Sequence, residues 1–443
     1  MIKACRTRIA KPGQTSLAIL RHTVGEMMQV ALDKLLKSLI TRGRLSVRWP
    51  DGCLRTYGAP GSGPEATVEI RNRRTVRKLL LNPELSVGEA YMDGDLVPSG
   101  IYDLLDMLAA NLEANPRANW SVVARQALGR VMRHIDTYNP CDRARRNVAH
   151  HYDLNGRLYS LFLDRDRQYS CAYFSRGDET LEDAQAAKKR HIAAKLFLDR
   201  PDLNVLDIGS GWGGLALTLA RDYGARVTGI TLSTEQLVES RARAEAMGLQ
   251  ERVNFELLDY RALDRRFDRI VSVGMFEHVG VGHYARFFRT LAACLTPDGM
   301  ALLHFIGQSD PPSSTNPWIR RYIFPGGYTP ALSEVLPRVE SSGLLTTDIE
   351  VLRLHYAKTL RHWRRRFAAN WDTIAALYDE RFCRMFEFYL ASAELGFRRR
   401  HQVVFQLQLA HRQTAVPLTR DYMIDTDGQF WQGNRPLLPP PAE

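Results

Sequence analysis

One short stretch combines an acidic residue with closely spaced glycines. It reads Val205-Leu-Asp-Ile-Gly-Ser-Gly-Trp-Gly-Gly214, and the apolar residues on either side are typical of a buried strand at 204–208 and a helix from 215. Glycine has no Cβ atom, so a glycine turn between a strand and a helix lets the backbone approach a ligand closely. The stretch therefore predicts a nucleotide-binding loop.

The order of residues in this loop narrows the ligand. The chain has Asp-x-Gly-x-Gly-x-Gly with Asp207 on the strand, whereas dinucleotide enzymes carry Gly-x-Gly-x-x-Gly. The order resembles motif I of the class I S-adenosylmethionine (SAM) methyltransferases. In that class a carboxylate at the strand end helps to hold the loop and the amino-acid portion of the ligand. The resemblance implies SAM as the cofactor.

The residues around this loop alternate between expected strands and helices. Strands are expected at 204–208, 226–231, 252–258, 268–274, 299–306, 346–354 and 402–409, with a long helical region before residue 400. The alternation is typical of a parallel sheet with crossover helices, in which ligands bind beyond the C-terminal strand ends. Ser233-Thr-Glu-Gln236 has the pattern of a capping box, with Gln236 returning to the cap.

Each strand end then receives an expected role. The second strand ends in Thr231-Leu-Ser without the acid that usually binds the ribose hydroxyls, so Gln236 or Glu235 must take that role. Asp259 and Tyr260 follow the third strand and are suited to the adenine amino group and ring. Met275-Phe-Glu-His278 follows the fourth strand, on the side expected for the substrate.

The N-terminal part has a different organisation. Residues 16–40 predict an amphipathic helix, 44–57 and 66–71 predict strands, and 76–81, 101–112 and 122–135 predict further helices. Residues 138–142 (Tyr-Asn-Pro-Cys-Asp) indicate a boundary. The Pro- and Gly-rich residues 425–443 predict a loose tail.

Composition sets broad limits. A chain of 443 residues that is 45% hydrophobic and 25% charged can bury a large core and form two or three domains. No apolar run approaches the ~20 residues that span a bilayer, and the N-terminus lacks the pattern of a signal peptide. The six scattered cysteines suit a reducing cytosol. Cys141, His150 and His151 lack standard ligand spacing, so we expect no metal site.

The net charge of +11 and the pI near 9.4 indicate an anionic partner. Basic residues cluster at 188–191, 361–367 and 397–401. Nucleic acid and an anionic membrane surface both suit this charge, and so does an ordinary solvated surface. No nucleic-acid-binding module accompanies the clusters.

Several further motifs make a family resemblance specific. From about residue 145 to 410 the chain resembles the cyclopropane-fatty-acyl-phospholipid synthases and the mycolic-acid cyclopropane synthases. The N-terminal part, with Val87-Gly-Glu-Ala-Tyr-Met-Asp-Gly-Asp95, resembles the N-terminal domain of the phospholipid synthases. The matching motifs are His150-His-Tyr-Asp-Leu154, Gln168-Tyr-Ser-Cys-Ala-Tyr173, Leu206-Asp-Ile-Gly-Ser-Gly-Trp-Gly213, Gly229-Ile-Thr-Leu-Ser233, Phe267-Asp-Arg-Ile-Val-Ser-Val-Gly-Met-Phe-Glu-His-Val-Gly280, Leu303-His-Phe-Ile-Gly307, Trp318-Ile-Arg-Arg-Tyr-Ile-Phe-Pro-Gly326 and His355-Tyr356.

The resemblance implies a reaction and a set of site residues. A cis alkene attacks the sulfonium methyl of SAM, and a base then removes a proton from the new methyl group as a cyclopropane ring closes. A bound bicarbonate ion serves as that base in the family. Its implied holders are Cys171, Glu277, His304, Tyr356 and the Ile306 backbone. The implied cofactor-binding residues are Tyr169, Ser170, Asp207, Gly209, Gly211, Gly213, Thr231, Leu232, Gln236, Asp259 and Tyr260.

We therefore expect an α/β protein with a class I SAM-methyltransferase, Rossmann-like sheet covered by helices on both faces, and a smaller, mainly helical α+β N-terminal domain. The expected domains are 1–140 (lipid engagement or dimerisation), 141–416 (catalysis) and 417–443 (tail). The expected substrates are unsaturated phospholipid acyl chains, and the cofactors are SAM and bicarbonate. The resemblance also implies a cytoplasmic protein, peripheral at the inner membrane face, which forms a homodimer and binds no nucleic acid.

Other interpretations remain open. Taken one at a time, Cys171, His304 and Tyr356 have the pattern of buried core residues. The same fold also serves methyltransferases that give methyl-branched or methylene acyl chains, or that act on a small amine. A membrane-binding protein with a vestigial SAM site would have lost Asp207, Gly209 or Glu277, and all three are present. Ala393 stands where some bacterial members carry a cysteine, which excludes a cysteine nucleophile at that position.

Overall fold

The computed structural model describes residues 12–61, 63–114 and 156–424, with side chains of the first helix described from residue 25 onward. The helix expected at 122–135, the boundary at 138–142 and the tail at 425–443 lie outside these residues. The chain divides into two compact units. The smaller is Met1–Trp120 with Asn316–Trp318 and Tyr378–Phe388, and the larger is Ser121–Thr315, Ile319–Leu377 and Tyr389–Glu443.

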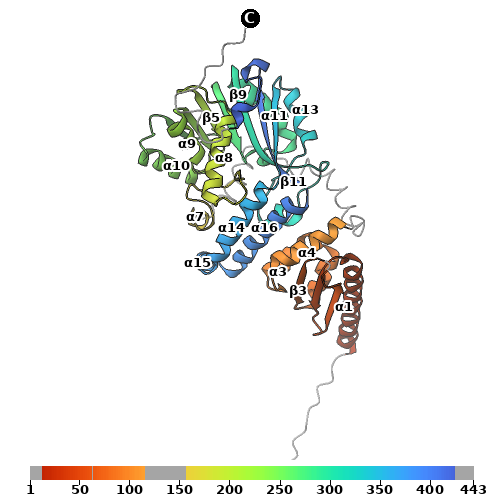
Figure 1. Ribbon diagram of the computed structural model, residues 1–443. Helices are drawn as coiled ribbons and strands as arrows, with labels where there is room; N and C mark the ends of the chain where they lie inside the picture. Colours follow the sequence, from red (N-terminus) through yellow and green to blue (C-terminus); the bar gives the residue numbers. More distant parts are fainter. Residues whose placement is uncertain (1–11, 62, 115–155, 425–443) are drawn as a thin grey trace, which may run out of the picture. The chain divides into compact units, whose positions relative to one another are not determined.

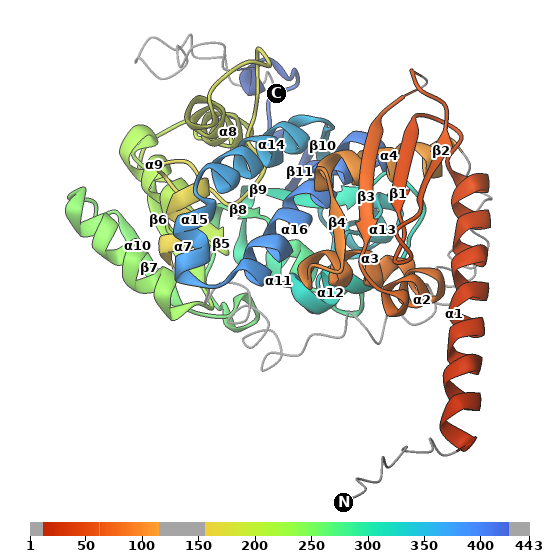
Figure 2. The same ribbon diagram turned by 90° about the horizontal axis from the view of Figure 1, so that it is seen from below.

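The smaller unit is built on a four-stranded mixed sheet in the order β2-β1-β3-β4 (Figure 2). Strand β1 is antiparallel to β2 and parallel to β3, and β4 is antiparallel to β3. Alternate residues of β1 and β3 are buried, as expected for a sheet with one covered face. The elements are α1 (Pro12–Leu39), β1 (Arg44–Arg48), β2 (Leu54–Gly58), β3 (Glu65–Ile70), α2 (Arg73–Leu81), α3 (Pro83–Met92), β4 (Leu96–Pro98) and α4 (Ile101–Ala114).

The single strand predicted at 44–57 was wrong, because this segment is a hairpin. The chain turns at Pro50-Asp51-Gly52, where Gly52 has a φ of 86° and the Asp51 carboxylate accepts a hydrogen bond from the Cys53 N–H at 2.9 Å. An Asx side chain and a glycine with positive φ are the usual means of reversing a strand. Helix α3 and strand β4 were not predicted.

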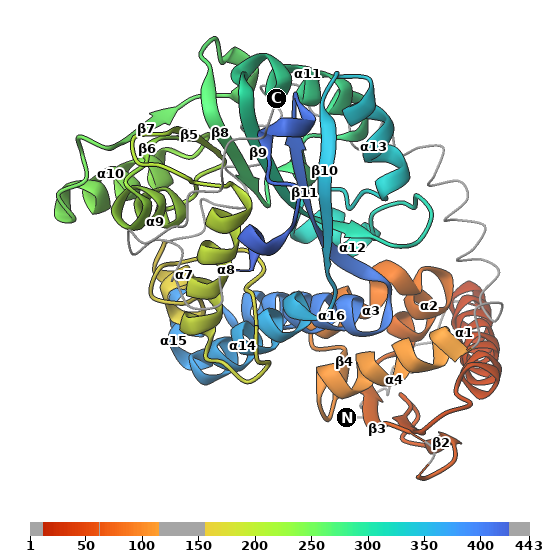
Figure 3. The ribbon, with the colours of Figure 1, turned by 45° about the horizontal axis from the view of Figure 1, so that its top comes forward.

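The larger unit contains a seven-stranded sheet in the order β10-β11-β9-β8-β5-β6-β7. Helices α8, α9 and α10 cover one face, and α11 and α13 cover the other (Figures 1 and 3). The strands are β5 (Asn204–Ile208), β6 (Arg226–Thr231), β7 (Val253–Leu257), β8 (Phe267–Val273), β9 (Leu295–Gln308), β10 (Leu345–Leu352) and β11 (Gln402–Ala410). The helices of this unit are α7 (Gly156–Phe162), α8 (Leu181–Lys195), α9 (Gly214–Tyr223), α10 (Thr234–Ala246), α11 (Tyr284–Cys294), α13 (Leu332–Glu340), α14 (His355–Ala369) and α15 (Trp371–Leu377). Helices α12 (Pro317–Tyr322) and α16 (Glu380–Arg399) are divided between the two units.

The expected α/β sheet with helices on both faces is confirmed, but the sheet is not wholly parallel. Strands β5 to β9 are parallel, whereas β11 is inserted antiparallel between β9 and β10. The chain reaches β11 directly from α16 and needs no crossover, so the last strand can enter in the reversed direction. From β5, the strands β6 and β7 are added on one side of the sheet, whereas β8 and β9 are added on the other, so the order of connection reverses between β5 and β8. Ligands of open α/β sheets bind at such a switch point.

Two apolar clusters hold the helices to the two faces of the sheet. One includes Val205, Leu217 and Phe255 on the side of α8 and α9, and the other includes Ile270, Phe276 and Phe288 on the side of α11. Because both faces are buried, the central strands are continuously apolar, which explains why the strand positions were visible in the sequence. Within the described ranges, no helix is long and apolar enough to span a membrane.

Candidate active site

The glycine loop follows β5 at the switch point. The backbone N–H groups of Gly209 and Ser210 both donate to the Ile230 carbonyl, at 2.9 and 3.0 Å, which folds the loop back over β6. Gly211 has a φ of 55°, and a Cβ atom added there would meet nothing within 4 Å. Gly213 has a φ of 81°, and its Cβ would lie 2.6 Å from the Phe255 ring. Gly211 therefore leaves space for a ligand, whereas Gly213 permits close packing of α9.

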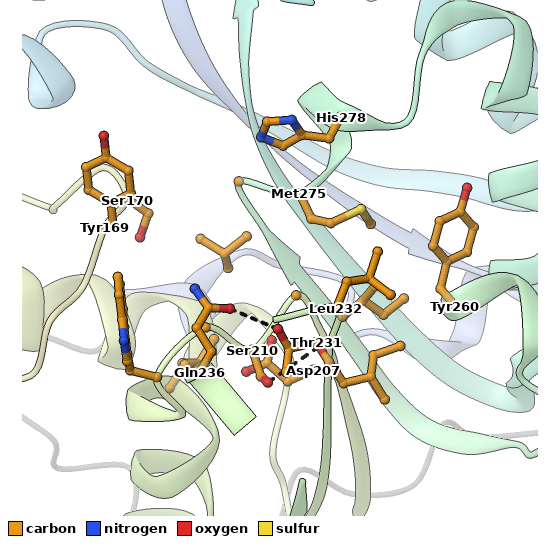
Figure 4. Close-up of a pocket in the computed structure, with 18 of the residues that line it drawn as sticks. Tyr169, Ser170, Asp207, Ser210, Thr231, Leu232, Gln236, Tyr260, Met275 and His278 are labelled. Carbon is orange, nitrogen blue, oxygen red and sulfur yellow. Dashed lines mark hydrogen bonds between the residues drawn. The ribbon is translucent and has the colours of Figure 1, made fainter. Parts of the chain in front are cut away.

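An open cavity with about 1280 Å³ of empty space lies at the C-terminal ends of β5, β6, β7 and β8. Figure 4 shows Tyr169 and Ser170 on one side and Tyr260 on the other. Gly213, one of the expected cofactor-binding residues, does not line the cavity. The other residues of that set all line it: Tyr169, Ser170, Asp207, Gly209, Gly211, Thr231, Leu232, Gln236, Asp259 and Tyr260.

Asp207 presents a carboxylate at the end of β5. The residue is buried, and its Oδ2 atom has no hydrogen-bond partner among the residues that the structure describes. Burial raises the pKa of Asp207 to about 7, and the nearby charge of Lys188 opposes that rise. A buried acceptor without a donor is costly unless a ligand supplies the donor. Asp207 therefore fits a cofactor that carries hydroxyl or ammonium groups.

The end of β6 distinguishes the two residues that the sequence offered for the ribose-binding role. Gln236 lines the cavity, whereas Glu235 accepts a hydrogen bond from the Gly156 N–H at 2.9 Å and lies outside the cavity wall. Ser233 accepts from the Gln236 N–H, as the capping pattern predicted, but the expected return bond from Gln236 to the cap was wrong. The Gln236 Oε1 atom instead accepts a hydrogen bond from the Thr231 hydroxyl at 2.8 Å (Figure 4). The Gln236 amide nitrogen is thereby left available as a donor in the cavity wall.

Asp259 and Tyr260 follow β7, as expected for an adenine site. Both Asp259 carboxylate oxygens accept hydrogen bonds from the Arg261 guanidinium, at 2.8 and 2.6 Å. Tyr260 packs edge-on against Phe287, with ring centroids 5.3 Å apart. The sequence interpretation missed Arg261, which lines the cavity and fixes the carboxylate in a fork-like pair.

A second group of polar residues lies beside β9. Glu277 accepts a hydrogen bond from the Ile306 backbone N–H at 2.7 Å, and its other oxygen, Oε2, is buried with no hydrogen-bond partner in the described part of the chain. Burial raises the pKa of Glu277 to about 7, against the lowering effect of that hydrogen bond. The Ile306 N–H is therefore engaged by Glu277, and it holds the carboxylate in place.

His304 lies two residues before Ile306 on the same strand. Its Nδ1 lies 3.0 Å from the Gln406 Nε2 atom on β11, and in this arrangement the amide donates to Nδ1. The imidazole proton is then on Nε2, where it is available as a donor. Burial lowers the pKa of His304 to about 3, so the ring is neutral at physiological pH. Gln406 was not predicted from the sequence.

Cys171 and Tyr356 form another part of the predicted catalytic set. Both are buried, and the segment after Cys171 is held by α14: the Ala172 N–H donates to the Thr359 hydroxyl at 3.0 Å, and the Phe174 N–H donates to His355 Nδ1 at 2.9 Å. Burial raises the pKa of the Cys171 thiol, so it remains protonated. None of the five predicted catalytic residues lines the cofactor cavity.

The basic clusters are less available to a partner than the sequence predicted. Lys188 is 1% exposed and binds Gln168 and Ser170, and His191 lies 2.6 Å from Glu350. In the later clusters, the buried carboxylate of Glu394 accepts hydrogen bonds from Arg364 and Arg398. Several of these basic side chains are therefore bound within the protein. Arg361, Arg365 and Arg400 remain exposed.

The strand order, the reversed β11 and a glycine loop at the switch point together define a class I SAM-dependent methyltransferase. The solved structures support this class. The cyclopropane synthase MmaA2 from Mycobacterium tuberculosis aligns with a TM-score of 0.58 and 33% identity, over 61% of this chain and 99% of that one. The mycolic acid cyclopropane synthase CmaA1, complexed with SAH and CTAB, aligns with a TM-score of 0.57 over 62% of this chain and 99% of that one, also at 33% identity.

The chain belongs to the mycolic acid cyclopropane synthetase family, whose model matches residues 140–407. A model described as a domain of unknown function matches residues 31–115. The cyclopropane-fatty-acyl-phospholipid synthase of Escherichia coli K12 is 39% identical over 78% of this chain and 88% of its own length. The tuberculostearic acid methyltransferase UfaA1 of Mycobacterium tuberculosis is 34% identical over 85% of this chain and 90% of its own length.

Proposed function

We propose that this enzyme converts a cis double bond of an unsaturated phospholipid acyl chain into a cyclopropane ring, with SAM as the source of the added carbon and bound bicarbonate as the base. The observation that carries the proposal is that Glu277, with its unpartnered oxygen, is bound to β9 at Ile306, two residues after the buried, neutral His304 that Gln406 holds. The similarity to the Escherichia coli phospholipid synthase supports the choice of substrate.

The cavity residues fit SAM by their chemistry. Asp207 and Gln236 offer hydrogen-bonding groups for the amino-acid and ribose portions, Gly211 leaves the backbone accessible, and Asp259 offers an acceptor to the adenine amino group. Bound SAM supplies a methyl group on a positively charged sulfur. The anionic or polar lining around Asp207 would favour that charge, and the cavity wall would keep the methyl group away from bulk water.

The residues beside β9 fit bicarbonate, which has one O–H group and acceptor oxygens. The Glu277 Oε2 atom offers an acceptor for the O–H, and the His304 Nε2–H offers a donor to an oxygen. Tyr356 would add a hydroxyl donor. Bound bicarbonate supplies a base without placing a side-chain carboxylate directly against an electrophilic acyl carbon. The role of this chain is to hold the base in a buried place that excludes water.

The expected relation to membranes and to a second copy is also part of the proposal. The exposed arginines Arg361, Arg365 and Arg400 would attract anionic headgroups, at roughly 1 kcal/mol for each basic residue near the surface. Sedimentation with anionic vesicles and no sedimentation with zwitterionic vesicles is the expected result. Light scattering of the purified protein would test the proposed homodimer, and a monomer at working concentration would contradict it.

Mass spectrometry of the acyl chains tests the reaction. The purified protein is incubated with SAM, bicarbonate and vesicles of cis-unsaturated phospholipid, and the product is then hydrogenated. A product that is one CH₂ heavier and resists hydrogenation establishes the cyclopropane ring. A product of that mass which takes up two hydrogens still contains a double bond, and would show that the enzyme makes a methylene or methyl-branched chain.

The base is tested separately. The reaction is repeated in buffer freed of carbon dioxide, where the proposal expects a lower rate that returns when bicarbonate is added. The matched control is Glu277→Gln, whose residual rate should no longer depend on bicarbonate. A wild-type rate that is unchanged in carbonate-free buffer would overturn the bicarbonate part of the proposal and leave the SAM-dependent reaction in place.

A further inference from the structure

A segment without regular secondary structure, Gln168–Phe174, connects the cofactor cavity to the Cys171 side of the site. Its first residues have no strand partner, and two side chains of helix α8 bind them. Gln185 donates its amide N–H groups to the carbonyls of Gln168 and Ser170, at 3.2 and 3.0 Å. Lys188, one turn later on the same face of α8, donates to side-chain oxygens of the same two residues.

The lysine restricts the hydrogen bonds that the Ser170 hydroxyl can form. The Lys188 ammonium lies 2.9 Å from Ser170 Oγ, and an ammonium group can only donate. The hydroxyl oxygen therefore accepts this bond, and its single O–H must be directed to another acceptor. Ser170 lines the cofactor cavity. Without the lysine, both lone pairs of the hydroxyl oxygen would be free to accept from a ligand, so donation to the ligand would be less favoured.

The same constraint applies to Gln168. Its Oε1 accepts from Lys188 at 2.6 Å, so its amide nitrogen points the other way and donates to Asp166 Oδ2 at 3.2 Å. One buried cation therefore constrains the hydrogen bonds of two residues in the cavity wall, Gln168 and Ser170. It also places a positive charge behind the hydroxyl, which strengthens that hydroxyl as a donor to an anion.

We infer that Lys188 is a positioning residue for the cofactor: it orients the Ser170 hydroxyl so that this group donates to the carboxylate of SAM. The inference rests on the proposed placement of SAM in the cavity. Burying an ammonium group is costly, and a well-packed apolar residue would serve packing alone at lower cost. The structure retains the charge at a position where its contacts are polar atoms of the cavity wall.

The helix itself offers a matched control. Lys195 lies two turns later on α8, is 2% exposed and forms an ion pair with Glu350 at 2.5 Å. It has the same residue type and the same burial as Lys188, but it does not line or support the cavity wall. A Lys→Met change at either position removes a buried cation from the same helix. Only the change at Lys188 alters the Ser170 hydroxyl.

The test measures binding of SAM and of decarboxylated SAM by calorimetry. Decarboxylated SAM keeps the adenosine, the sulfonium and the amine and lacks only the carboxylate. Lys188→Met is expected to weaken SAM binding by roughly tenfold to a hundredfold, as for a lost hydrogen bond to a charged group, and to leave decarboxylated SAM nearly unchanged. Lys195→Met should keep the wild-type ratio of the two affinities. The ratio does not depend on the fraction of each variant that is folded.

A double-mutant cycle with Ser170→Ala tests whether the lysine acts through the hydroxyl. If it does, adding Lys188→Met to Ser170→Ala changes the affinity ratio little further, whereas independent effects would add. An unchanged ratio in Lys188→Met, or additive effects in the cycle, would overturn the inference and leave SAM binding intact. A wild-type protein that binds neither ligand would instead overturn the placement of SAM, and the inference with it.

Discussion

The cofactor cavity and the group around Glu277 lie in the same unit but are assembled in opposite ways. Most of the cavity wall is formed by loops that directly follow consecutive strands, joined by the segment at Tyr169 and Ser170, so its side chains belong to short local motifs. The Glu277 group joins residues from separate elements: His304 on β9 meets Gln406 on β11, more than a hundred positions later. The cavity can be recognised from spacing, whereas the second group requires the fold.

The difference extends to electrostatics. Asp207 and Glu277 are both buried carboxylates with a raised pKa, each with one oxygen left without a described partner. The nearby charge of Lys188 lowers the pKa of Asp207, whereas backbone hydrogen bonds, chiefly that of the Ile306 N–H, lower the pKa of Glu277. One carboxylate therefore suits a cationic cofactor, and the other suits a small group that brings its own proton.

The largest expected effect separates binding from turnover. Glu277→Gln keeps an oxygen to accept from the Ile306 N–H, so the fold and the cofactor cavity should be retained. We expect kcat to fall by roughly 10²–10⁴-fold, the range for loss of an acid–base group, with an unchanged Kd for SAM. Steady-state kinetics and calorimetry measure the two. Equal losses in kcat and in SAM affinity would place Glu277 in the cofactor site, and the cavity and the Glu277 group would then not be separate.

The pH dependence of stability gives the next effect. Burial raises the pKa of Glu277 from 4.5 to about 7, so the folded protein holds this proton more tightly than the unfolded chain does. The resulting stabilisation is complete below about pH 4.5 and is lost as the pH rises through about 7. Between pH 5 and 8 the wild type should lose up to ~3 kcal/mol more unfolding free energy than Glu277→Gln. The free energy of unfolding is measured by denaturant titration at each pH. If it changed equally with pH in the two proteins, the raised pKa of Glu277 would be contradicted.

Asp207→Asn tests the other carboxylate. The change removes the charge while keeping the size of the side chain, and Asp207 lies in the cavity wall. We expect SAM binding to weaken by roughly tenfold, because a charged hydrogen bond is lost. At pH 8 the unfolding free energy should rise, since a buried charge with a pKa near 7 is no longer present. A variant that loses stability as well as affinity would show that Asp207 is needed for folding.

The smallest effect concerns Gln406. Replacing it with leucine removes the donor to His304 Nδ1, so the imidazole proton is no longer held on Nε2. We expect kcat to fall by roughly 10-fold, the size of one supporting contact, with little change in Kd for SAM. Gln406→Glu is the comparison, because its acceptor oxygen would hold the proton on Nδ1. If both variants match the wild type, the tautomer of His304 does not matter to the reaction.

The sequence predicted the central strands because they are apolar runs bounded by polar and turn-forming residues. Strand β5 lies at the predicted residues, and β6 also agrees. The hairpin after Arg48 was missed because its turn is only Pro50-Asp51-Gly52, inside an otherwise strand-like run. The reversal of β11 was missed because an apolar strand has the same pattern in either direction.

The supporting residues of the site could not be found from local patterns. The Gln236 side chain forms its bond with Thr231 across a strand end, although the sequence pattern favoured the cap. Lys188 was part of a run of basic residues that indicated a surface, and only its burial beside Gln168 and Ser170 shows its role. Such contacts depend on which elements pack together, and spacing within one element does not encode that.

The segment Gln168–Phe174 has a consequence for how this enzyme can diverge. Tyr169 and Ser170 lie in the cavity wall, and Cys171 follows with no residue between them. Both ends of the segment are tied down, by Gln185 and Lys188 on α8 and by Thr359 and His355 on α14. A single insertion or deletion here would shift both halves of the active site at once. Within this segment, divergence is therefore expected through substitutions and not through changes in length.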